Sequence, residues 1–286
     1  MDLEHQRILI TGASLGLGRA VAEACVKGGA SVVISARTEA PLQQARDELE
    51  ARAAPCVRVI AHPADVAHAA DVEALIAAAE AELGGLDGVV CCAGVYGPIG
   101  RFEEVDWEAW VQALHINLLG TVLVCRGAVP LLRRAGGGSI VTLSGGGATA
   151  PLPRFTAYGA SKAAVVRLAE SLSVELADDD IAVNAVAPGA LNTRLLDEVL
   201  EAGPERAGAM HGRAVEQAES GGASLERAAE LCALLLAQRA GGVTGRLISA
   251  PWDPWEQLPD HAEALRGSDV YTLRRIVPED RPDVAL

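Results

Sequence analysis

Seven short apolar runs, separated by stretches with helical spacing, limit the folds open to this chain more than any other feature. The runs are Arg7 to Thr11, Ser31 to Ser35, Val57 to Ala61, Gly88 to Cys92, Ser139 to Leu143, Ile181 to Val186 and Val243 to Ser249. Helices of this length between strands favour parallel pairing, and a parallel sheet is covered by helices on both faces. The sequence therefore predicts one α/β domain over residues 1–250, a doubly wound parallel sheet.

The helices are predicted between these runs. They occupy the residues after Gly18 through Lys27, Pro41 to Arg52, Asp71 to Leu83, Trp107 to Arg134, the residues from Tyr158 to Leu176, and Leu225 to Gln238. Two segments stand apart. Residues 192–222 are polar, glycine-rich and weakly periodic, which predicts a mobile lid with short helices. Residues 251–286 are rich in proline and charge, and they predict an extension tied back to the same domain by Trp252, Trp255 and Tyr271.

Charge and cysteine content exclude several classes of partner. The net charge of −14 argues against nucleic acids and anionic membranes. The six cysteines lack metal-ligand spacing, so they are expected to be reduced, buried thiols, with no metal site. The start Met1-Asp2-Leu3-Glu4 is acidic, unlike a signal peptide, and polar residues interrupt the apolar tract from Leu114 to Leu132. A cytoplasmic protein without a membrane span is expected.

Glycines follow the first predicted strand at positions 12, 16 and 18. Glycine between a strand and a helix lets the backbone approach a pyrophosphate, which then lies at the helix N-terminus. In a doubly wound sheet this spacing favours a dinucleotide site, the alternative being an ordinary strand–helix turn. The second strand ends near Arg37 rather than at an acidic residue. Its guanidinium matches a 2′-phosphate, which favours NADP(H) and leaves NAD(H) possible if Arg37 only stacks on adenine.

Tyr158 and Lys162 are four residues apart where a helical pattern begins, so their side chains share one face. A phenol titrates near pH ~10 and is a poor acid or base at neutral pH. A neighbouring ammonium favours the phenolate, and we expect it to lower the pKa of Tyr158 towards the range useful for catalysis. The alternative is that Tyr158 caps a core and Lys162 lies on a solvated face.

These motifs, taken in chain order, resemble those of the short-chain dehydrogenase/reductase family from about Arg7 to Ser249. The motifs are Thr11-Gly12-x-x-x-Gly16-x-Gly18, Asp65-Val66, Ala93-Gly94, Asn117, Ser144, Tyr158-x-x-x-Lys162 and Pro188-Gly189. The resemblance implies a Rossmann-type fold and an NADP(H)-dependent oxidoreductase that interconverts a ketone and a secondary alcohol. It also implies a small-molecule substrate and a homodimer or homotetramer.

The resemblance assigns roles to individual residues. Ser144 would orient the substrate oxygen, Tyr158 would transfer its proton, and Asn117 would hold a water beside Lys162. Lys162 would also bind the nicotinamide ribose, Asp65 would contact adenine, and Thr193 would contact the nicotinamide. The implied cofactor-binding residues are Gly12, Ser14, Leu15, Gly16, Leu17, Gly18, Arg37, Thr38, Asp65, Val66, Ala93, Gly94, Tyr158, Lys162, Pro188, Gly189, Leu191 and Thr193.

The chain departs from the family pattern in three places. Cys91 and Cys92 stand where two asparagines are usual, which removes local hydrogen bonds; small buried hydrophobes are the expected role. The catalytic serine usually lies thirteen residues before the tyrosine, where this chain has Gly145. Ser144 is expected to replace it through a longer loop, the alternative being a site without its serine. After Ser249 the usual Asp-Gly-Gly is missing, which puts a tetramer contact at the last strand in doubt.

The function is predicted as reversible hydride transfer between NADP(H) and a carbonyl or alcohol carbon. Two alternatives remain open: an epimerase or dehydratase without net redox change, and a non-catalytic dinucleotide-binding protein. Residues 94–101, 145–156 and 192–222 are expected to line the substrate pocket. Arg101, Arg154 and Arg194 suggest an anionic or polyhydroxylated substrate or, equally, a solvated rim.

Overall fold

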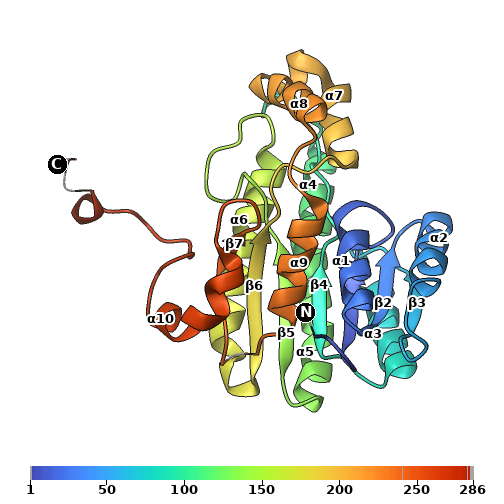
Figure 1. The fold of residues 1–286 in the computed structure, drawn as a ribbon. Coiled ribbons are helices and arrows are strands. Elements are labelled where there is room, and N and C mark those ends of the chain that lie inside the picture. Colours follow the sequence, from blue (N-terminus) through green and yellow to red (C-terminus); the bar gives the residue numbers. More distant parts are fainter. Residues whose placement is uncertain (1, 240, 282, 284–286) are drawn as a thin grey trace.

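A seven-stranded parallel sheet forms the centre of the molecule, in the order β3-β2-β1-β4-β5-β6-β7 (Figure 1). The computed structural model describes residues 2–239, 241–281 and 283. The strands are β1 (Arg7–Thr11), β2 (Ser31–Ala36), β3 (Val59–Pro63), β4 (Gly88–Cys91), β5 (Gly138–Leu143), β6 (Ile181–Ala187) and β7 (Leu247–Ser249). The chain order reverses direction at β1, because β2 and β3 lie on one side of it and β4 on the other. The predicted doubly wound Rossmann-type fold is therefore confirmed.

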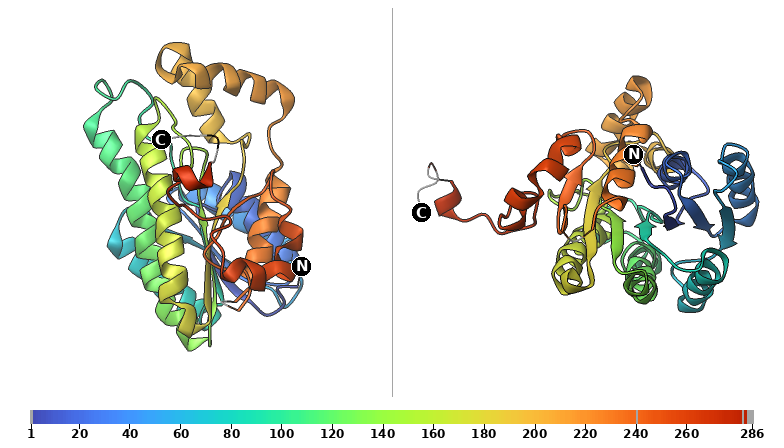
Figure 2. Two further views of the ribbon diagram at one scale, coloured as in Figure 1. Left: turned by 90° about the vertical axis from the view of Figure 1, so that its left-hand side faces the viewer. Right: turned by 60° about the horizontal axis from the view of Figure 1, so that its bottom comes forward.

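Helices cover both faces of this sheet, as the two views in Figure 2 show. One face carries α1 (Gly16–Lys27), α2 (Glu39–Glu50) and α9 (Leu225–Leu236). The other carries α3 (Ala69–Leu83), α5 (Gly120–Arg134) and α6 (Thr156–Glu175). The helix α4 (Trp107–Leu114) continues into α5 through a π-helical turn, η1 (His115–Leu119). Each face has its own apolar core, so the strands are buried on both sides.

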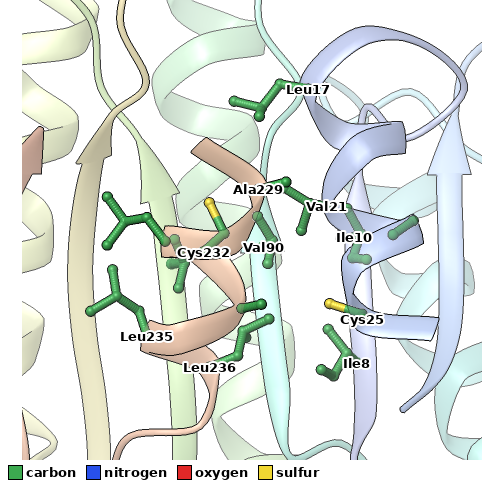
Figure 3. Close-up of a cluster of buried hydrophobic side chains, with 14 of the residues drawn as sticks. Ile8, Ile10, Leu17, Val21, Cys25, Val90, Ala229, Cys232, Leu235 and Leu236 are labelled. Atoms are coloured by element: carbon green, nitrogen blue, oxygen red, sulfur yellow. The ribbon is translucent and has the colours of Figure 1, made fainter. Parts of the chain in front are cut away.

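The core under α1 and α9 is built from aliphatic side chains and two buried thiols, Cys25 and Cys232 (Figure 3). The helix α1 lies on β1 and β2, and α9 lies on β4, β5 and β6; between them Ile10 and Val90 have no exposed surface. The chain has only 3% aromatic residues, and small aliphatic side chains let these helices approach closely. This packing fixes the N-terminal end of α1, which begins in the glycine-rich loop.

The helix Trp107–Arg134 is long and apolar enough to cross a membrane, judged by length and composition alone. In the fold, α5 lies against α3 and against the strands β4 and β5. Its buried residues, Val124, Ala128, Leu131 and Leu132 among them, belong to the core on that face of the sheet. The helix is thus accounted for as part of a protein core.

Two helices stand above the carboxyl ends of the strands, where the lid was predicted. They are α7 (Arg194–Ala207), which is kinked at Gly203, and α8 (Ala209–Ser220) (Figures 1 and 2). Both are longer than the short helices predicted from residues 192–222. Leu196, Val199 and Ala214 turn inwards and pack with Phe155 and Tyr158 in a third apolar cluster. The lid segment therefore forms one wall above the sheet, and its predicted mobility stays a prediction.

The last strand is shorter than predicted and begins at Leu247, although the Gly245 N–H still donates to the Val183 carbonyl and the Arg246 carbonyl accepts from the Ala185 N–H, each at 2.8 Å. The side chain of Asn184 donates to the Val243 carbonyl at 2.8 Å and accepts from the Arg246 N–H at 3.1 Å. The Thr244 hydroxyl accepts from the Val183 N–H at 3.0 Å, and Gly245 has φ of +69°. Side chains thus take part of the hydrogen bonding of residues 243–246, and the positive φ of Gly245 interrupts the extended backbone.

The C-terminal extension begins with η3 (Trp255–His261) and α10 (Ala262–Arg266), which lie beside α9 and β7 (Figure 1). Trp255 is buried, and its Nε1 donates to the Ala250 carbonyl at 3.0 Å. Tyr271 accepts a backbone hydrogen bond from Leu247, 2.8 Å away, on the open edge of β7. Trp252 was also predicted to tie the extension back, and this is wrong: its side chain is 84% exposed.

A buried arginine holds the extension in place. The guanidinium of Arg246 donates to the carbonyl oxygens of Ser268 at 2.9 Å and Val270 at 2.7 Å, and also to that of Leu265. Glu170 of α6 accepts from the Leu273 N–H at 2.6 Å. Beyond this point the chain leaves the sheet and ends in η4 (Pro278–Asp280), well away from the rest of the fold in Figure 1.

Candidate active site

One cavity of about 1170 Å³ opens at the carboxyl ends of the strands, between the glycine-rich loop and the helices α7 and α8. In open α/β sheets, ligands bind at this edge, beside the point where the strand order reverses. All of the residues predicted to bind the cofactor line this cavity, from Gly12 to Thr193. Ser144, Tyr158 and Lys162 line it as well, whereas Asn117 does not. The structure thus gathers nearly the whole predicted site in one space.

The glycine-rich loop needs glycine at two positions because a side chain there would collide with neighbouring backbone. A Cβ atom on Gly12 would lie 2.7 Å from the Ala93 backbone, and Gly12 has φ of +67°. A Cβ atom on Gly18 would lie 2.3 Å from the Gly12 carbonyl oxygen. Glycine at these positions lets β1, the start of α1 and the end of β4 come together. The free N–H groups at the start of α1 then face the cavity, as an anion-binding loop requires.

The far end of the cavity suits a phosphorylated ribose. Arg37 follows β2, is exposed and lines the cavity, and among the described residues it forms no ion pair. Ser35, two residues earlier in β2, has a buried hydroxyl that lacks a hydrogen-bond partner. Asp65 accepts from the Ala67 N–H at 3.0 Å through Oδ1, which starts the turn before α3. A free guanidinium and an unpartnered hydroxyl are donors available for a 2′-phosphate.

Tyr158 and Lys162 lie on consecutive turns of α6, and both side chains are buried. The Nζ of Lys162 donates to the Leu143 carbonyl at 2.7 Å and lies 5.7 Å from the centre of the Tyr158 ring. Desolvation lowers the pKa of Lys162 to about 8. Burial raises the pKa of Tyr158, and the nearby Tyr96 raises it further. We expected Lys162 to lower the pKa of Tyr158, and this is wrong. Desolvation of the buried phenol raises its pKa by more than the ammonium lowers it.

The position thirteen residues before the tyrosine is Gly145, and it faces the Tyr158 hydroxyl directly. A Cβ atom on Gly145 would lie 2.1 Å from Tyr158 Oη. A second close contact, 2.7 Å from a Cβ on Gly147 to Gly159 Cα, presses the same loop against the first turn of α6. Ser144 is 2% exposed, and its Oγ has no hydrogen-bond partner. Its assignment as the substrate-orienting hydroxyl stays a prediction.

Asn117 lies in the π-helical turn and is fully buried. Its Oδ1 accepts from the Val95 N–H at 2.9 Å, and its Nδ2 donates to the Val95 carbonyl at 2.9 Å and to Ser161 Oγ at 3.0 Å. A Cβ atom on Gly94 would lie 3.3 Å from Asn117 Oδ1 and 3.5 Å from Lys162 Nζ, so both side chains lie behind Gly94. The amide is thus engaged in holding backbone, and its predicted role with a water stays a prediction.

The two cysteines after β4 differ in position. Cys91 is buried, with its Sγ 4.0 Å from that of Cys125, and Cys92 lines the cavity. Burial raises the pKa of the Cys92 thiol to about 12, so the thiol is protonated at neutral pH. Cys91 is the small buried hydrophobe that was predicted, whereas Cys92 is half-buried and Cys56 is exposed, so the expectation that all six thiols are buried is wrong for these two. Among the described residues, no group of His, Cys, Asp or Glu side chains has the arrangement of a metal site.

Four further residues line the cavity; three lie in the ranges 94–101 and 192–222 that were predicted to form the pocket, although none was singled out, and Trp252 lies outside them. They are Tyr96 after β4, Met210 and Arg213 of α8, and Trp252 of the extension. Each reaches the site through tertiary packing rather than through a motif. Of the three arginines considered for the substrate, Arg194 lines the cavity and forms an ion pair with Glu198 at 3.3 Å, whereas Arg101 and Arg154 lie outside it.

Comparisons with known proteins agree with this geometry. The sequence model described as short chain dehydrogenase matches residues 6–203. Dehydrogenase/reductase SDR family member 4 from Sus scrofa is 35% identical over 191 residues, which cover 67% of this chain and 67% of the relative.

Two solved structures match closely. A short-chain type dehydrogenase/reductase from Mycobacterium ulcerans is 31% identical with a TM-score of 0.78, covering 97% of this chain and 100% of that one. The L-sorbose reductase from Gluconobacter frateurii, complexed with NADPH and L-sorbose, is 30% identical with a TM-score of 0.77, covering 87% of this chain and 97% of that one. The first of these alignments takes in most of the C-terminal extension.

Proposed function

Because the chain belongs to the short-chain dehydrogenase/reductase family, we propose that it reduces a ketone to a secondary alcohol with NADPH as the hydride donor. The observation that carries this proposal is the single cavity shared by Tyr158, Lys162, the Gly12–Gly18 loop and Arg37. A proton donor and a dinucleotide cradle in one space are what carbonyl reduction requires.

The protonation state of the site favours the direction of reduction. Burial keeps the Tyr158 phenol protonated at neutral pH, so it is a proton donor before the reaction starts. Lys162, with a pKa of about 8, is mainly charged at neutral pH, and its ammonium stabilises negative charge that develops on the phenol oxygen. The hydrogen bond from Lys162 Nζ to the Leu143 carbonyl holds the ammonium group in one position.

The residues of the cavity fit an NADPH molecule. The backbone at Gly12 and Gly18 would hold the pyrophosphate, where any side chain would collide with the chain itself. Arg37 would pair with the 2′-phosphate, and Thr193, which lies beside Gly16, would contact the nicotinamide end. When bound, the dinucleotide supplies the hydride, and the protein supplies orientation, exclusion of water and the proton from Tyr158.

The walls around Tyr158 favour a substrate with apolar groups beside its carbonyl. Leu196 and Val199 of α7 pack with Phe155 and Tyr158, and Leu152 and Met210 lie against this cluster. The cavity continues from here to Arg213 at its rim. An apolar wall near the acid and a cation near the opening suit an amphipathic ketone, with its polar end towards solvent.

The test is to incubate the purified protein with NADPH and a panel of aryl and alkyl ketones. Oxidation of NADPH is measured as the loss of its nicotinamide absorbance. The wild type should oxidise NADPH only when a ketone is present. The Tyr158→Phe variant, which keeps the ring but lacks the proton, should lose at least about a hundredfold in turnover while its NADPH affinity stays unchanged.

Three outcomes separate this proposal from the alternatives. Product formed without net change in NADPH absorbance supports an epimerase or dehydratase. Binding of NADPH without turnover of any ketone supports a non-catalytic protein. A Tyr158→Phe variant within tenfold of the wild type means that another group transfers the proton.

A further inference from the structure

A second phenol lies beside the proton donor. The rings of Tyr96 and Tyr158 are 4.7 Å apart between centroids and meet edge to face at 68°. Tyr96 also meets Phe155 in the same manner, at 5.2 Å, and both tyrosines line the cavity. Edge-to-face contacts of this kind fix the relative orientation of aromatic rings. The position of Tyr96 is therefore tied to that of Tyr158.

A chain of buried hydrogen bonds holds the backbone just before Tyr96. Asn117 makes both backbone bonds to Val95, each 2.9 Å long, as a neighbouring strand would. The same amide donates to Ser161 Oγ, which in turn donates to the Tyr158 carbonyl at 2.8 Å. One buried side chain thus connects the segment before Tyr96 to the helix that carries Tyr158. Fully satisfied buried networks hold such groups in one arrangement.

The hydroxyl of Tyr96 is available to a ligand. No hydrogen bond from this hydroxyl to another group is found among the described residues, although its ring is held on two sides. Burial, together with the carboxylate of Glu198, raises the pKa of Tyr96, so the group is a proton-bearing donor at neutral pH. Gly145, by contrast, offers no hydroxyl and has no room for one beside Tyr158.

A carbonyl oxygen under reduction needs two donors. It carries two lone pairs, and negative charge builds on it as the hydride reaches the carbon. Tyr158 would serve one lone pair and give up its proton as its own O–H bond breaks, while the hydride, supplied by NADPH as it is oxidised to NADP⁺, would form the new C–H bond and the C=O double bond would become single. A second donor stabilises the charge without being consumed.

We propose that the Tyr96 hydroxyl is this second donor to the substrate oxygen, and that Asn117 is the positioning residue that holds it there. The inference rests on the proposed function. It assigns Tyr96 a role at the reacting oxygen that position 145 does not fill, and it gives the saturated Asn117 amide a purpose that does not involve a water.

The test uses the full-length protein with NADPH and acetophenones that carry para substituents of graded electron withdrawal. Tyr96→Phe keeps both ring contacts and removes only the hydroxyl. It should lower kcat by about tenfold to a hundredfold and leave the NADPH Kd unchanged. It should also steepen the dependence of kcat on the substituent, because the developing charge has lost a donor. The chain has three tyrosines, and Tyr271→Phe, in the extension, is the matched control.

The positioning role of Asn117 is tested with a double-mutant cycle. Asn117→Ala should lower kcat, and adding Tyr96→Phe to it should cost much less than Tyr96→Phe costs in the wild type. Fully additive losses mean that Asn117 acts independently of Tyr96 and contradict the positioning role. An unfolded Asn117→Ala variant is replaced by Ser161→Ala, which removes one bond of the same network and should give the same non-additivity.

The outcomes separate this inference from the proposed function. An active wild type whose kcat and substituent dependence are unchanged in Tyr96→Phe overturns the role of Tyr96 and leaves the reductase proposal standing. A wild type that binds NADPH but oxidises it with none of the ketones overturns both.

Discussion

Tyr158 and Lys162 are both buried, and burial moves the pKa of each towards its uncharged form. For Tyr158 that form is the acid that carbonyl reduction needs. For Lys162 it is the form that loses the charge the site needs, so activity should decline as the pH rises through about 8. The same desolvation that prepares one group therefore sets the upper pH limit of the other.

Lys162 should also make stability depend on pH in a direction opposite to that of a paired lysine. Its pKa is lower in the folded chain, about 8 against 10.5, so between these values the unfolded state binds more protons. The free energy of unfolding should then rise by about 2 kcal/mol between pH about 8 and about 10. Urea unfolding of the wild type and of Lys162→Met measures this, because the variant lacks the contribution. Equal slopes for the two proteins would mean that Lys162 is better solvated than its burial implies.

Two variants test whether the catalytic hydroxyl belongs to Ser144 or has been lost with Gly145. Ser144 competes with Tyr96 for the place of the second donor: if the Ser144 hydroxyl steadies the substrate oxygen, Ser144→Ala should lower turnover by about a hundredfold without changing cofactor affinity, and Tyr96→Phe should have little effect. Gly145→Ser should bring no gain and should reduce turnover, since its Cβ would collide with Tyr158 Oη. Steady-state kinetics of the two variants, compared with those of the wild type and of Tyr96→Phe, measure both effects. A silent Ser144→Ala together with an activating Gly145→Ser would contradict this assignment.

Arg37 should determine the choice of cofactor. Its exposed guanidinium lines the cavity, and we expect tighter binding of NADPH than of NADH. Arg37→Asp should lose about 2 kcal/mol of NADPH binding, roughly thirtyfold in affinity, and should erase or reverse the preference. Fluorescence titration with both dinucleotides gives the ratio. A wild type that prefers NADH would refute the assignment.

At the scale of helices and strands, local patterns predicted most of what forms. The strands β1 and β6 and the helices between them were predicted correctly. In these elements the spacing of apolar residues follows which side chains face the core. The strand β7 was overestimated because the side chain of Asn184, far away in the sequence, binds the Val243 carbonyl and the Arg246 N–H, and because Gly245 has a positive φ. Periodicity carries no record of such a replacement.

The site divides in the same way. Residues fixed by backbone geometry or by a helix turn, such as Gly12, Tyr158 and Lys162, could be predicted from spacing. Tyr96 could not, because its partner Tyr158 lies on another element and only the fold brings the rings to 4.7 Å. The shift in the pKa of Tyr158 was also missed, since the depth of burial is a property of the folded chain.

At the scale of the whole molecule, the extension is bound to the sheet mainly through Arg246, whose side chain donates to three backbone carbonyls. Arg246→Met should release this segment, and losing about 3 kcal/mol of local stability should speed proteolysis within residues 262–273 on the order of a hundredfold. Arg274→Met is the matched control, since Arg274 forms exposed ion pairs with Asp269 and Asp280. Equal cleavage rates in the two variants would show that other contacts hold the extension.

The buried guanidinium of Arg246 also bears on how the chain matures on the ribosome. Its acceptors lie 19 to 24 residues further along the chain. A chain that has formed β7 but not yet residues 265–271 therefore carries an arginine without these three acceptors, beside a strand edge that Tyr271 has not yet paired with. Domains emerge N-terminus first, and partly finished sheets expose such edges to other chains. The segment from Leu265 to Tyr271 therefore acts as the cover of this edge, and a chain truncated after Ala250 should aggregate more readily than the full chain.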